Sequence, residues 1–252
     1  MALQGGVLII GSLLWDQDNE RQQWRQRLRE ADEKPVPAPI RYGRFSSKTK
    51  PGTYTMVFSR LCYRHKQLGQ GVVVPFRRPI ESFDGLREEA ECLAAAEGLN
   101  NKSEWGAVGL LCREPAKLPA PFLQQWTEYF TARFVGYQAF DGHTPSEGPV
   151  ITRGGFLKLR WPLSGKDNKQ YDVLLATPTN AEVQGQPNLR RYPLPREIAS
   201  SIPTDKRNYF VTNVRKGIRT SQDSAIWKTV RRLDPDFAAE RSDVSSALAD
   251  GR

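Results

Sequence analysis

The segment GVLIIGSLLWD, residues 6–16, is an apolar run that stops on a glycine and a hydroxyl before the chain becomes polar. Its part from Val7 to Ile10 is apolar and rich in branched side chains, which predicts a short, fully buried strand. Residues 16–34 carry apolar side chains at helical spacing between charged faces, which predicts an amphipathic helix. The segment therefore predicts a strand, a tight turn at Gly11 and a helix.

Three segments rich in β-branched and aromatic residues follow, after the prolines of KPVPAPI (34–40) end this helix. They are RYGRFSS (41–47), TYTMVFSRLCY (53–63) and QGVVVPF (70–76). Turns with Gly, Pro and Lys separate them, so we predict consecutive strands of one sheet.

The next helix is predicted over SFDGLREEAECLAAAEGLNN (82–101), with Ser82 or Asp84 at its start and Gly98 just past its end. At 100° per residue, Glu97 falls on the stripe of Leu86, Ala90 and Leu93 that should face the core. Burial and the negative end of the helix dipole both disfavour its anion, so we expect a raised pKa, suited to a general base. A frayed last turn would instead put Glu97 in water, and the spacing does not decide between the two.

The second half of the chain predicts a mixed succession of elements. They are a strand at 105–112, a helix at 119–134 with an apolar stripe, a hairpin made of 156–163 and 171–178, an irregular Pro-rich and basic arm from about Asn180, a helix at 220–233 started by Thr220 and Asp223, and a disordered tail at 238–252. We therefore predict an α+β domain, residues 1–180, with a mixed curled sheet and flanking helices, and a C-terminal extension, 181–252.

Composition excludes several classes of protein but does not indicate a function. The chain has 252 residues, a net charge of +9 and three widely separated cysteines, so neither a disulfide framework nor a zinc site is indicated. No apolar stretch approaches the roughly 20 residues that span a bilayer, and no signal peptide is apparent, so we expect a cytoplasmic protein that does not enter membranes.

The order of five motifs is more specific than any one of them: GSLLW (11–15), RYGRFS (41–46), TYTMVFS (53–59), QGVVVPF (70–76) and CLAAAEG (92–98). Together they resemble the γ-glutamylcyclotransferase-like superfamily, which includes the ChaC and AIG2-like proteins. The resemblance covers roughly residues 6–113 and implies a mixed sheet curled into a barrel with flanking helices. The superfamily loop carries tyrosine before Gly-Ser, and this chain has Ile10 there, so it would be a divergent member.

The resemblance also implies an activity of the acyltransferase or lyase type, the release of 5-oxoproline from a small-molecule γ-glutamyl amide. It implies that Gly11, Ser12, Leu13 and Leu14 form the substrate-binding loop and that Glu97 is the general base and acid. Neither a metal nor a cofactor is implied. The alternative for Gly11-Ser12 is a plain turn into a helix capped by Ser12 or Asp16. Arg41 and Arg44 could pair with a substrate carboxylate, although such arginines are usually solvated or in salt bridges.

A second hypothesis is an inactive scaffold that binds nucleic acid, or a protein partner, through its basic C-terminal region. Cations there would neutralise phosphates, and aromatic rings between them would stack on bases. The cations are Arg190, Arg191, Arg196, Lys206, Arg207, Arg215, Lys216, Arg219, Lys228, Arg231 and Arg232, and the aromatic residues are Tyr192, Tyr209, Phe210 and Trp227. The alternative is a solvated basic surface whose aromatic side chains anchor the segment.

Overall fold

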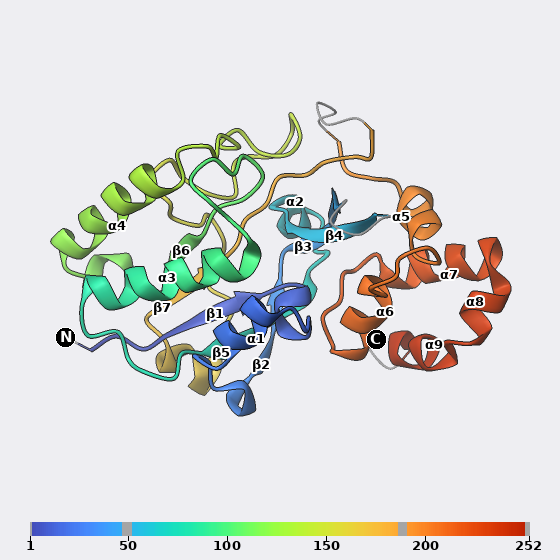
Figure 1. Ribbon diagram of the computed structural model, residues 1–252, viewed down its shortest axis with the longest axis horizontal. Coiled ribbons are helices and arrows are strands. Elements are labelled where there is room, and N and C mark those ends of the chain that lie inside the picture. Colours follow the sequence, from blue (N-terminus) through green and yellow to red (C-terminus); the bar gives the residue numbers. More distant parts are fainter. Residues whose placement is uncertain (1, 47–51, 186–190, 250–252) are drawn as a thin grey trace.

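The computed structural model describes residues 2–46, 52–185 and 191–249 and contains a mixed five-stranded sheet flanked by helices (Figure 1). The strands lie in the order β2-β5-β1-β7-β6. Their bounds are β1 (Gly5–Ile9), β2 (Lys34–Ala38), β5 (Gly69–Pro75), β6 (Gly109–Cys112) and β7 (Val173–Ala176). The prediction of an α+β fold with a mixed sheet is confirmed.

Strand β1 is the central strand, which explains its apolar sequence. All five of its residues are buried, and it pairs antiparallel with β5 and parallel with β7, so that Val7 lies between Val74 and Leu175. A strand covered on both faces reads as a continuous apolar run. Because β1 is central, the turn that follows it at Gly11 emerges in the middle of one edge of the sheet.

The strand pairing differs from the prediction in three places. The strands β3 (Ile40–Ser46) and β4 (Thr53–Phe58) do not join the large sheet but pair with each other, with a bulge between Tyr42 and Arg44 and an isolated bridge from Arg44 to Glu182. KPVPAPI forms the edge strand β2, where proline is tolerated because one side of the strand needs no ladder hydrogen bonds. Residues 156–163 form only isolated bridges, and β7 pairs with β1 and β6 instead of forming a hairpin with them.

The expected curling into a barrel is not found among the described residues. The strands β2 and β6 end the five-stranded sheet on opposite sides and do not pair with each other, and β3 and β4 form a separate hairpin. An open mixed sheet with flanking helices is therefore the architecture of the described chain.

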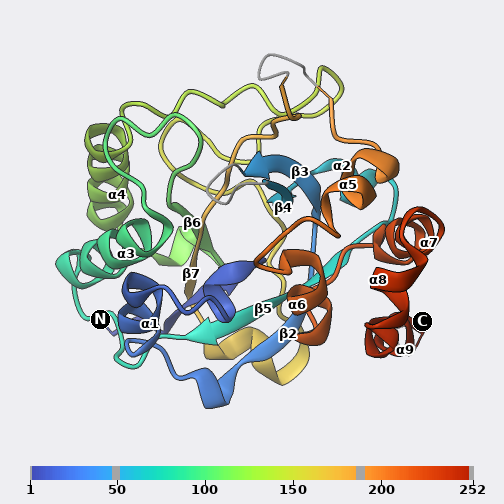
Figure 2. The ribbon, with the colours of Figure 1, turned by 45° about the vertical axis from the view of Figure 1, so that its right-hand side comes forward.

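Helices α1 (Asn19–Arg25) and α3 (Phe83–Glu97) pack side by side against the sheet, with α4 (Ala120–Arg133) beside α3 (Figures 1 and 2). The predicted helix over 16–34 is shortened to α1, because the chain must turn at Gln26 to enter β2. A single turn, α2 (Leu61–Arg64), follows β4. None of the helices in the described ranges is long and apolar enough to cross a bilayer.

The C-terminal region is a group of five helices rather than an irregular arm with a disordered tail. They are α5 (Pro195–Ser201), α6 (Tyr209–Arg215), α7 (Asp223–Leu233), α8 (Pro235–Ala239) and α9 (Ser242–Ala249). The tail is ordered as far as 249 because Val244 is fully buried and Trp227 donates a hydrogen bond of 2.8 Å to the Ser245 hydroxyl. Part of the predicted arm, 186–190, and the end of the predicted tail, 250–252, lie outside the described residues.

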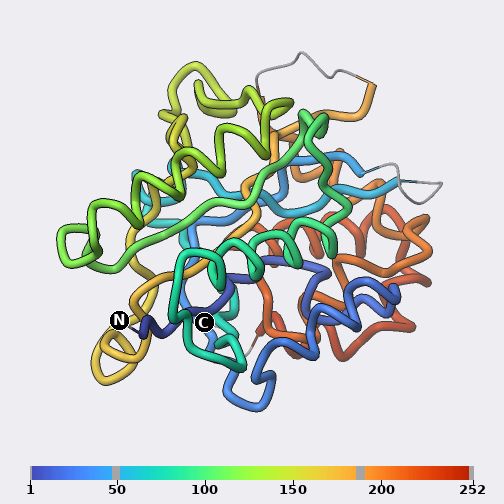
Figure 3. Tube along the Cα trace, turned by 60° about the vertical axis from the view of Figure 1, so that its left-hand side comes forward, coloured from blue at the N-terminus to red at the C-terminus, as the bar shows by residue number. Residues whose placement is uncertain are grey.

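These helices lie on the side of the molecule away from α3 and α4 (Figure 3). They are nevertheless joined to the rest of the protein by a continuous apolar core. Phe210 of α6 stacks on Tyr42 of β3, with ring centroids 5.8 Å apart, and packs against Trp227 of α7. The C-terminal helices therefore hold α6 against the β3–β4 hairpin, which places two α6-side residues, Arg207 and Tyr209, near the end of β1.

Candidate functional site

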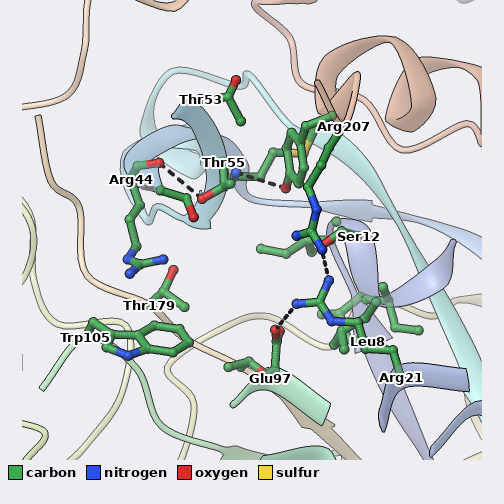
Figure 4. Close-up of a pocket in the computed structure, with 18 residues that line it drawn as sticks. Leu8, Ser12, Arg21, Arg44, Thr53, Thr55, Glu97, Trp105, Thr179 and Arg207 are labelled. Atoms are coloured by element: carbon green, nitrogen blue, oxygen red, sulfur yellow. Dashed lines mark hydrogen bonds and ion pairs between the residues drawn. The ribbon is translucent and has the colours of Figure 1, made fainter. Parts of the chain in front are cut away.

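A pocket opens where the end of β1, the end of α3, the β3–β4 hairpin and α6 meet (Figure 4). The residues that line it are Leu8, Ile9, Ile10, Gly11, Ser12, Leu13, Arg21, Arg44, Ser46, Thr53, Thr55, Met56, Glu97, Trp105, Thr177, Thr179, Arg207 and Tyr209. The pocket thus brings together Glu97 and three of the four residues expected to form the binding loop. One wall is apolar, and the remainder carries hydroxyl groups and arginines.

Glu97 reaches the pocket because the helix that carries it does not fray. Helix α3 begins at Ser82, whose hydroxyl accepts a hydrogen bond from the Gly85 amide, and ends at Glu97, followed by Gly98 in the left-handed conformation, φ 72°. Leu86 and Leu93 on the same stripe are fully buried. The Glu97 side chain is 18% exposed, so the alternative of a frayed turn with a solvated carboxylate is wrong.

Arg21 of α1 connects the two parts of the expected site, and the sequence reasoning did not single it out. Its guanidinium lies 3.1 Å from the Glu97 carboxylate and donates a 2.6 Å hydrogen bond to the Ser12 hydroxyl. It also pairs with Asp16 at 2.7 Å and donates to the Ala96 carbonyl at 3.1 Å. A buried guanidinium with its donors occupied is held in one geometry, so Arg21 fixes the Gly11 turn relative to Glu97.

Gly11 is required by close packing rather than by a left-handed backbone. Its φ of −173° is an extended conformation that any residue can adopt. A Cβ atom at this position, however, would overlap the hydroxyl of Tyr209. The glycine therefore allows the end of β1 to lie directly against α6.

The turn after Gly11 is a short 3-10 helix (Ser12–Leu14) and not the capped start of α1. Helix α1 begins after Asp18, so Ser12 and Asp16 are not its caps. The Ser12 hydroxyl instead accepts the hydrogen bond from Arg21, while Leu13 lines the pocket.

Leu14 does not take the place expected for it in the binding loop. It does not line the pocket, and its side chain is 8% exposed and belongs to the apolar core. Its backbone N–H donates to the Gly11 carbonyl at 3.3 Å. The turn of the 3-10 helix directs Leu14 inward, so only Gly11, Ser12 and Leu13 of the predicted loop face the pocket.

Tyr209 contributes a phenol to the pocket from the C-terminal helices. Its hydroxyl accepts a 3.2 Å hydrogen bond from the Met56 amide, and its ring packs edge-on against Trp15. Burial raises the pKa of Tyr209 to about 12, so the phenol keeps its proton at neutral pH. No local sequence signal marks this residue, because its place in the pocket depends on contacts with Gly11 and Trp15, almost 200 residues earlier in the chain.

Two further arginines line the pocket, from different elements. Arg207 pairs with Asp18 at 2.9 Å and with Asp16 at 3.1 Å. Arg44 of β3 lies over the ring of Trp105, 4.3 Å from its centroid. Arg41 of the same strand does not line the pocket and lies over Tyr192 instead, at 4.1 Å.

The aromatic residues of the nucleic-acid hypothesis are not available for stacking on bases. Tyr192, Tyr209, Phe210 and Trp227 are all at least 93% buried, and Phe210 and Trp227 stack on each other. These side chains anchor the C-terminal helices, as the alternative interpretation predicts. Of the cations, Lys228, Arg231 and Arg232 are exposed on α7 as expected, and Arg190 lies outside the described residues.

The cysteines are not arranged as ligands or nucleophiles. No group of three or more His, Cys, Asp or Glu side chains within 2–46, 52–185 and 191–249 could hold a metal ion. Burial raises the pKa of Cys62 to about 11 and that of Cys112 to about 12, which keeps both as thiols at neutral pH.

Comparisons of the chain with known protein families, with curated proteins and with solved structures found no match.

Proposed function

We propose that this chain is a γ-glutamylcyclotransferase-like enzyme, and that its open mixed sheet and helices are a divergent form of that superfamily's fold. One observation carries the proposal. The Glu97 carboxylate and the Gly11 turn, which lie far apart in the sequence, line the same pocket and are joined by Arg21. The resemblance of the five N-terminal motifs supports the same assignment.

In the proposed reaction, the α-amine nitrogen of a γ-glutamyl amide attacks the γ-carbonyl carbon of the same glutamyl group. A C–N bond forms and closes a five-membered ring, and the bond from that carbon to the leaving nitrogen breaks. Glu97 takes a proton from the attacking nitrogen and delivers a proton to the leaving nitrogen. The products are 5-oxoproline and a free amine, and the step as written transfers no electrons.

The attack is intramolecular, so catalysis depends on holding the glutamyl group in a bent, near-attack geometry. The backbone N–H groups of Ser12 and Leu13 open the 3-10 helix, where such groups have no partner inside the helix. We assign them to the substrate's α-carboxylate, which places the neighbouring α-amine beside Glu97. Arg21 is a positioning residue, since it holds both Ser12 and Glu97.

Tyr209 supplies a hydroxyl that suits the reaction. The superfamily loop has a tyrosine where this chain has Ile10, and Tyr209 brings a phenol to the same neighbourhood from α6. A protonated phenol can donate a hydrogen bond to the γ-carbonyl oxygen, where negative charge develops during the attack. We assign Tyr209 to that role.

The test is release of 5-oxoproline from γ-glutamyl amides by wild-type protein and by the variant Glu97→Gln. We expect the rate to fall about 100-fold or more in the variant, because the amide cannot accept the proton. The matched control is Glu91→Gln, on the same helix, whose carboxylate binds Arg133 at 2.9 Å and does not line the pocket. Equal rates in wild type and Glu97→Gln, or no 5-oxoproline from any γ-glutamyl amide, would contradict the proposal.

A further inference from the structure

Among the three arginines that line the pocket, the structure leaves one without a carboxylate partner. Arg21 is balanced by Asp16 and Glu97, and Arg207 by Asp16 and Asp18. In the described part of the chain, no acidic side chain lies within ion-pair distance of Arg44. Glu182 and Glu97 act on Arg44 electrostatically from a longer distance, so among the described residues its guanidinium has no carboxylate in direct contact.

Arg44 is also partly removed from water. Its side chain is half-buried, and its Nε atom is buried with no hydrogen-bond partner among the described residues. Burial lowers the pKa of Arg44 below its usual value despite the opposing effect of the Glu182 and Glu97 carboxylates, but a guanidinium remains charged in proteins. A partly desolvated cation with an unused donor is stabilised when an anion binds to it, so Arg44 is a candidate anion site.

The surroundings of Arg44 match a planar anion. The Trp105 ring supports one face of the guanidinium and leaves the edge that carries its N–H groups for a ligand. A carboxylate can accept two parallel hydrogen bonds from a guanidinium.

The position of Arg44 identifies the part of the substrate that would carry this carboxylate. Figure 4 shows Arg44 and Trp105 on one side of the pocket and Ser12, Arg21 and Arg207 on the other, with Glu97 at the margin between them. If the glutamyl end lies on the Ser12 side, as in the proposed function, the leaving amine lies toward Arg44.

We propose that Arg44, supported by Trp105, forms a subsite for a carboxylate on the leaving amine. This inference rests on the proposed function for the orientation of the substrate. It makes Arg44 the residue that distinguishes γ-glutamyl amino acids and peptides, whose leaving amines carry a carboxylate, from uncharged γ-glutamyl amines.

Two probes isolate the carboxylate: γ-glutamylalanine and γ-glutamylisopropylamide, which has a methyl group in place of the carboxylate. Their affinities are measured by calorimetry on Glu97→Gln protein, so that turnover does not interfere. We expect γ-glutamylalanine to bind about 10-fold or more tightly than the amide, and Arg44→Gln to abolish this difference. In the active protein, Arg44→Gln should raise KM for γ-glutamylalanine about 10-fold more than KM for the isopropylamide.

The control is Arg41→Gln, which removes an arginine from the same strand that also lies on an aromatic ring but faces away from the pocket, and the preference should survive. Arg44→Lys keeps the charge without the two-point geometry, should retain part of the preference, and replaces Arg44→Gln if that variant does not fold.

The outcomes separate the two proposals. Equal binding of both probes, or a preference that persists in Arg44→Gln, would overturn the subsite, while Glu97-dependent release of 5-oxoproline would leave the proposed function standing. An Arg44-dependent preference without any 5-oxoproline would support the carboxylate site and overturn the reaction. Failure of both probes to bind would overturn both.

Discussion

Glu97 and Glu147 are glutamates in two polar regions of the protein, and their surroundings differ. Glu147 is 3% exposed, and its carboxylate accepts hydrogen bonds from the Ser59 hydroxyl at 2.9 Å, from the Tyr192 hydroxyl at 2.6 Å and from the Arg60 amide. Glu97 is 18% exposed, contacts Arg21 at 3.1 Å and borders an open pocket. Glu147 also lines a second pocket, but its carboxylate is already bound by three donors, whereas the Glu97 carboxylate lies in the pocket that contains the Gly11 turn.

The difference separates a structural carboxylate from a candidate catalytic one. Glu147 joins the loop that carries it to the start of α2 and, through Tyr192, to the segment before α5. Its bonds are all within the protein, so its loss should appear as lost stability. The loss of Glu97 should appear instead as lost chemistry, because Arg21 keeps its contacts with Asp16, Ser12 and the Ala96 carbonyl.

The largest expected effect on stability is that of Glu147→Ala. The substitution leaves two hydroxyls and a backbone amide without an acceptor in the interior, which should lower the free energy of unfolding by about 3–5 kcal/mol. Glu97→Ala should lower it by about 2 kcal/mol, because the buried guanidinium of Arg21 loses one carboxylate but keeps Asp16. Urea unfolding of both variants measures the difference. Comparable losses in the two variants would break the distinction between the two regions.

Asp223 in the C-terminal helices is a second buried carboxylate. The pH dependence of the free energy of unfolding tests whether it contributes to stability. It is 1% exposed and is bound by the amide and hydroxyl of Thr220, and burial raises its pKa from 3.8 to about 7. Between these values the folded protein binds more protons than the unfolded chain, so this contribution to stability is lost as pH rises. From pH 5 to pH 7 the loss should be about 2 kcal/mol.

The measurement is the free energy of unfolding across this pH range for wild-type protein and Asp223→Asn. The asparagine can still accept from Thr220 but does not titrate, so subtracting the two pH profiles isolates Asp223 from the other ionisable groups. Parallel profiles would show that the Asp223 carboxylate does not titrate differently in the folded protein.

The parts of the fold that could be predicted are those determined locally. The strand after Gly5 and the helix from Ser82 to Gly98 each carry their own periodicity and end signals, and both were predicted close to their true bounds. Strand pairing was not predictable, because β1 pairs with β7 across more than 160 residues and the sequence of neither segment specifies its partner strand. The prolines of β2 gave a helix-breaking signal that is equally compatible with an edge strand.

The residues of the candidate site also divide into those that a local sequence signal marks and those that depend on distant contacts. Glu97 and Gly11 could be predicted, because each breaks an apolar pattern. Arg21 was missed although it lies three residues before Trp24 and seven before Leu28, on the apolar stripe, and that spacing was a usable signal. Tyr209 carries no such signal, since its role depends on the packing of α6 against the distant β3–β4 hairpin.

Tyr209 is buried, as Glu147 is, and it also lines the pocket, as Glu97 does. Its substitution has the smallest expected effect on stability. Tyr209→Phe removes the acceptor of the Met56 amide and should lower the free energy of unfolding by about 1 kcal/mol. If its hydroxyl donates to the reacting carbonyl, 5-oxoproline release should fall about 100-fold with little change in KM. An unchanged kcat would confine Tyr209 to packing.

The same phenol is what excludes a side chain at Gly11, so the two positions should be coupled. Gly11→Ala places a methyl group against the Tyr209 hydroxyl, whereas the nearest ring carbon lies at an ordinary 3.4 Å. Gly11→Ala should therefore destabilise the wild-type background more than the Tyr209→Phe background, and a double-mutant cycle on the free energy of unfolding measures that coupling. Additive effects would mean that the end of β1 and α6 do not make this contact in solution.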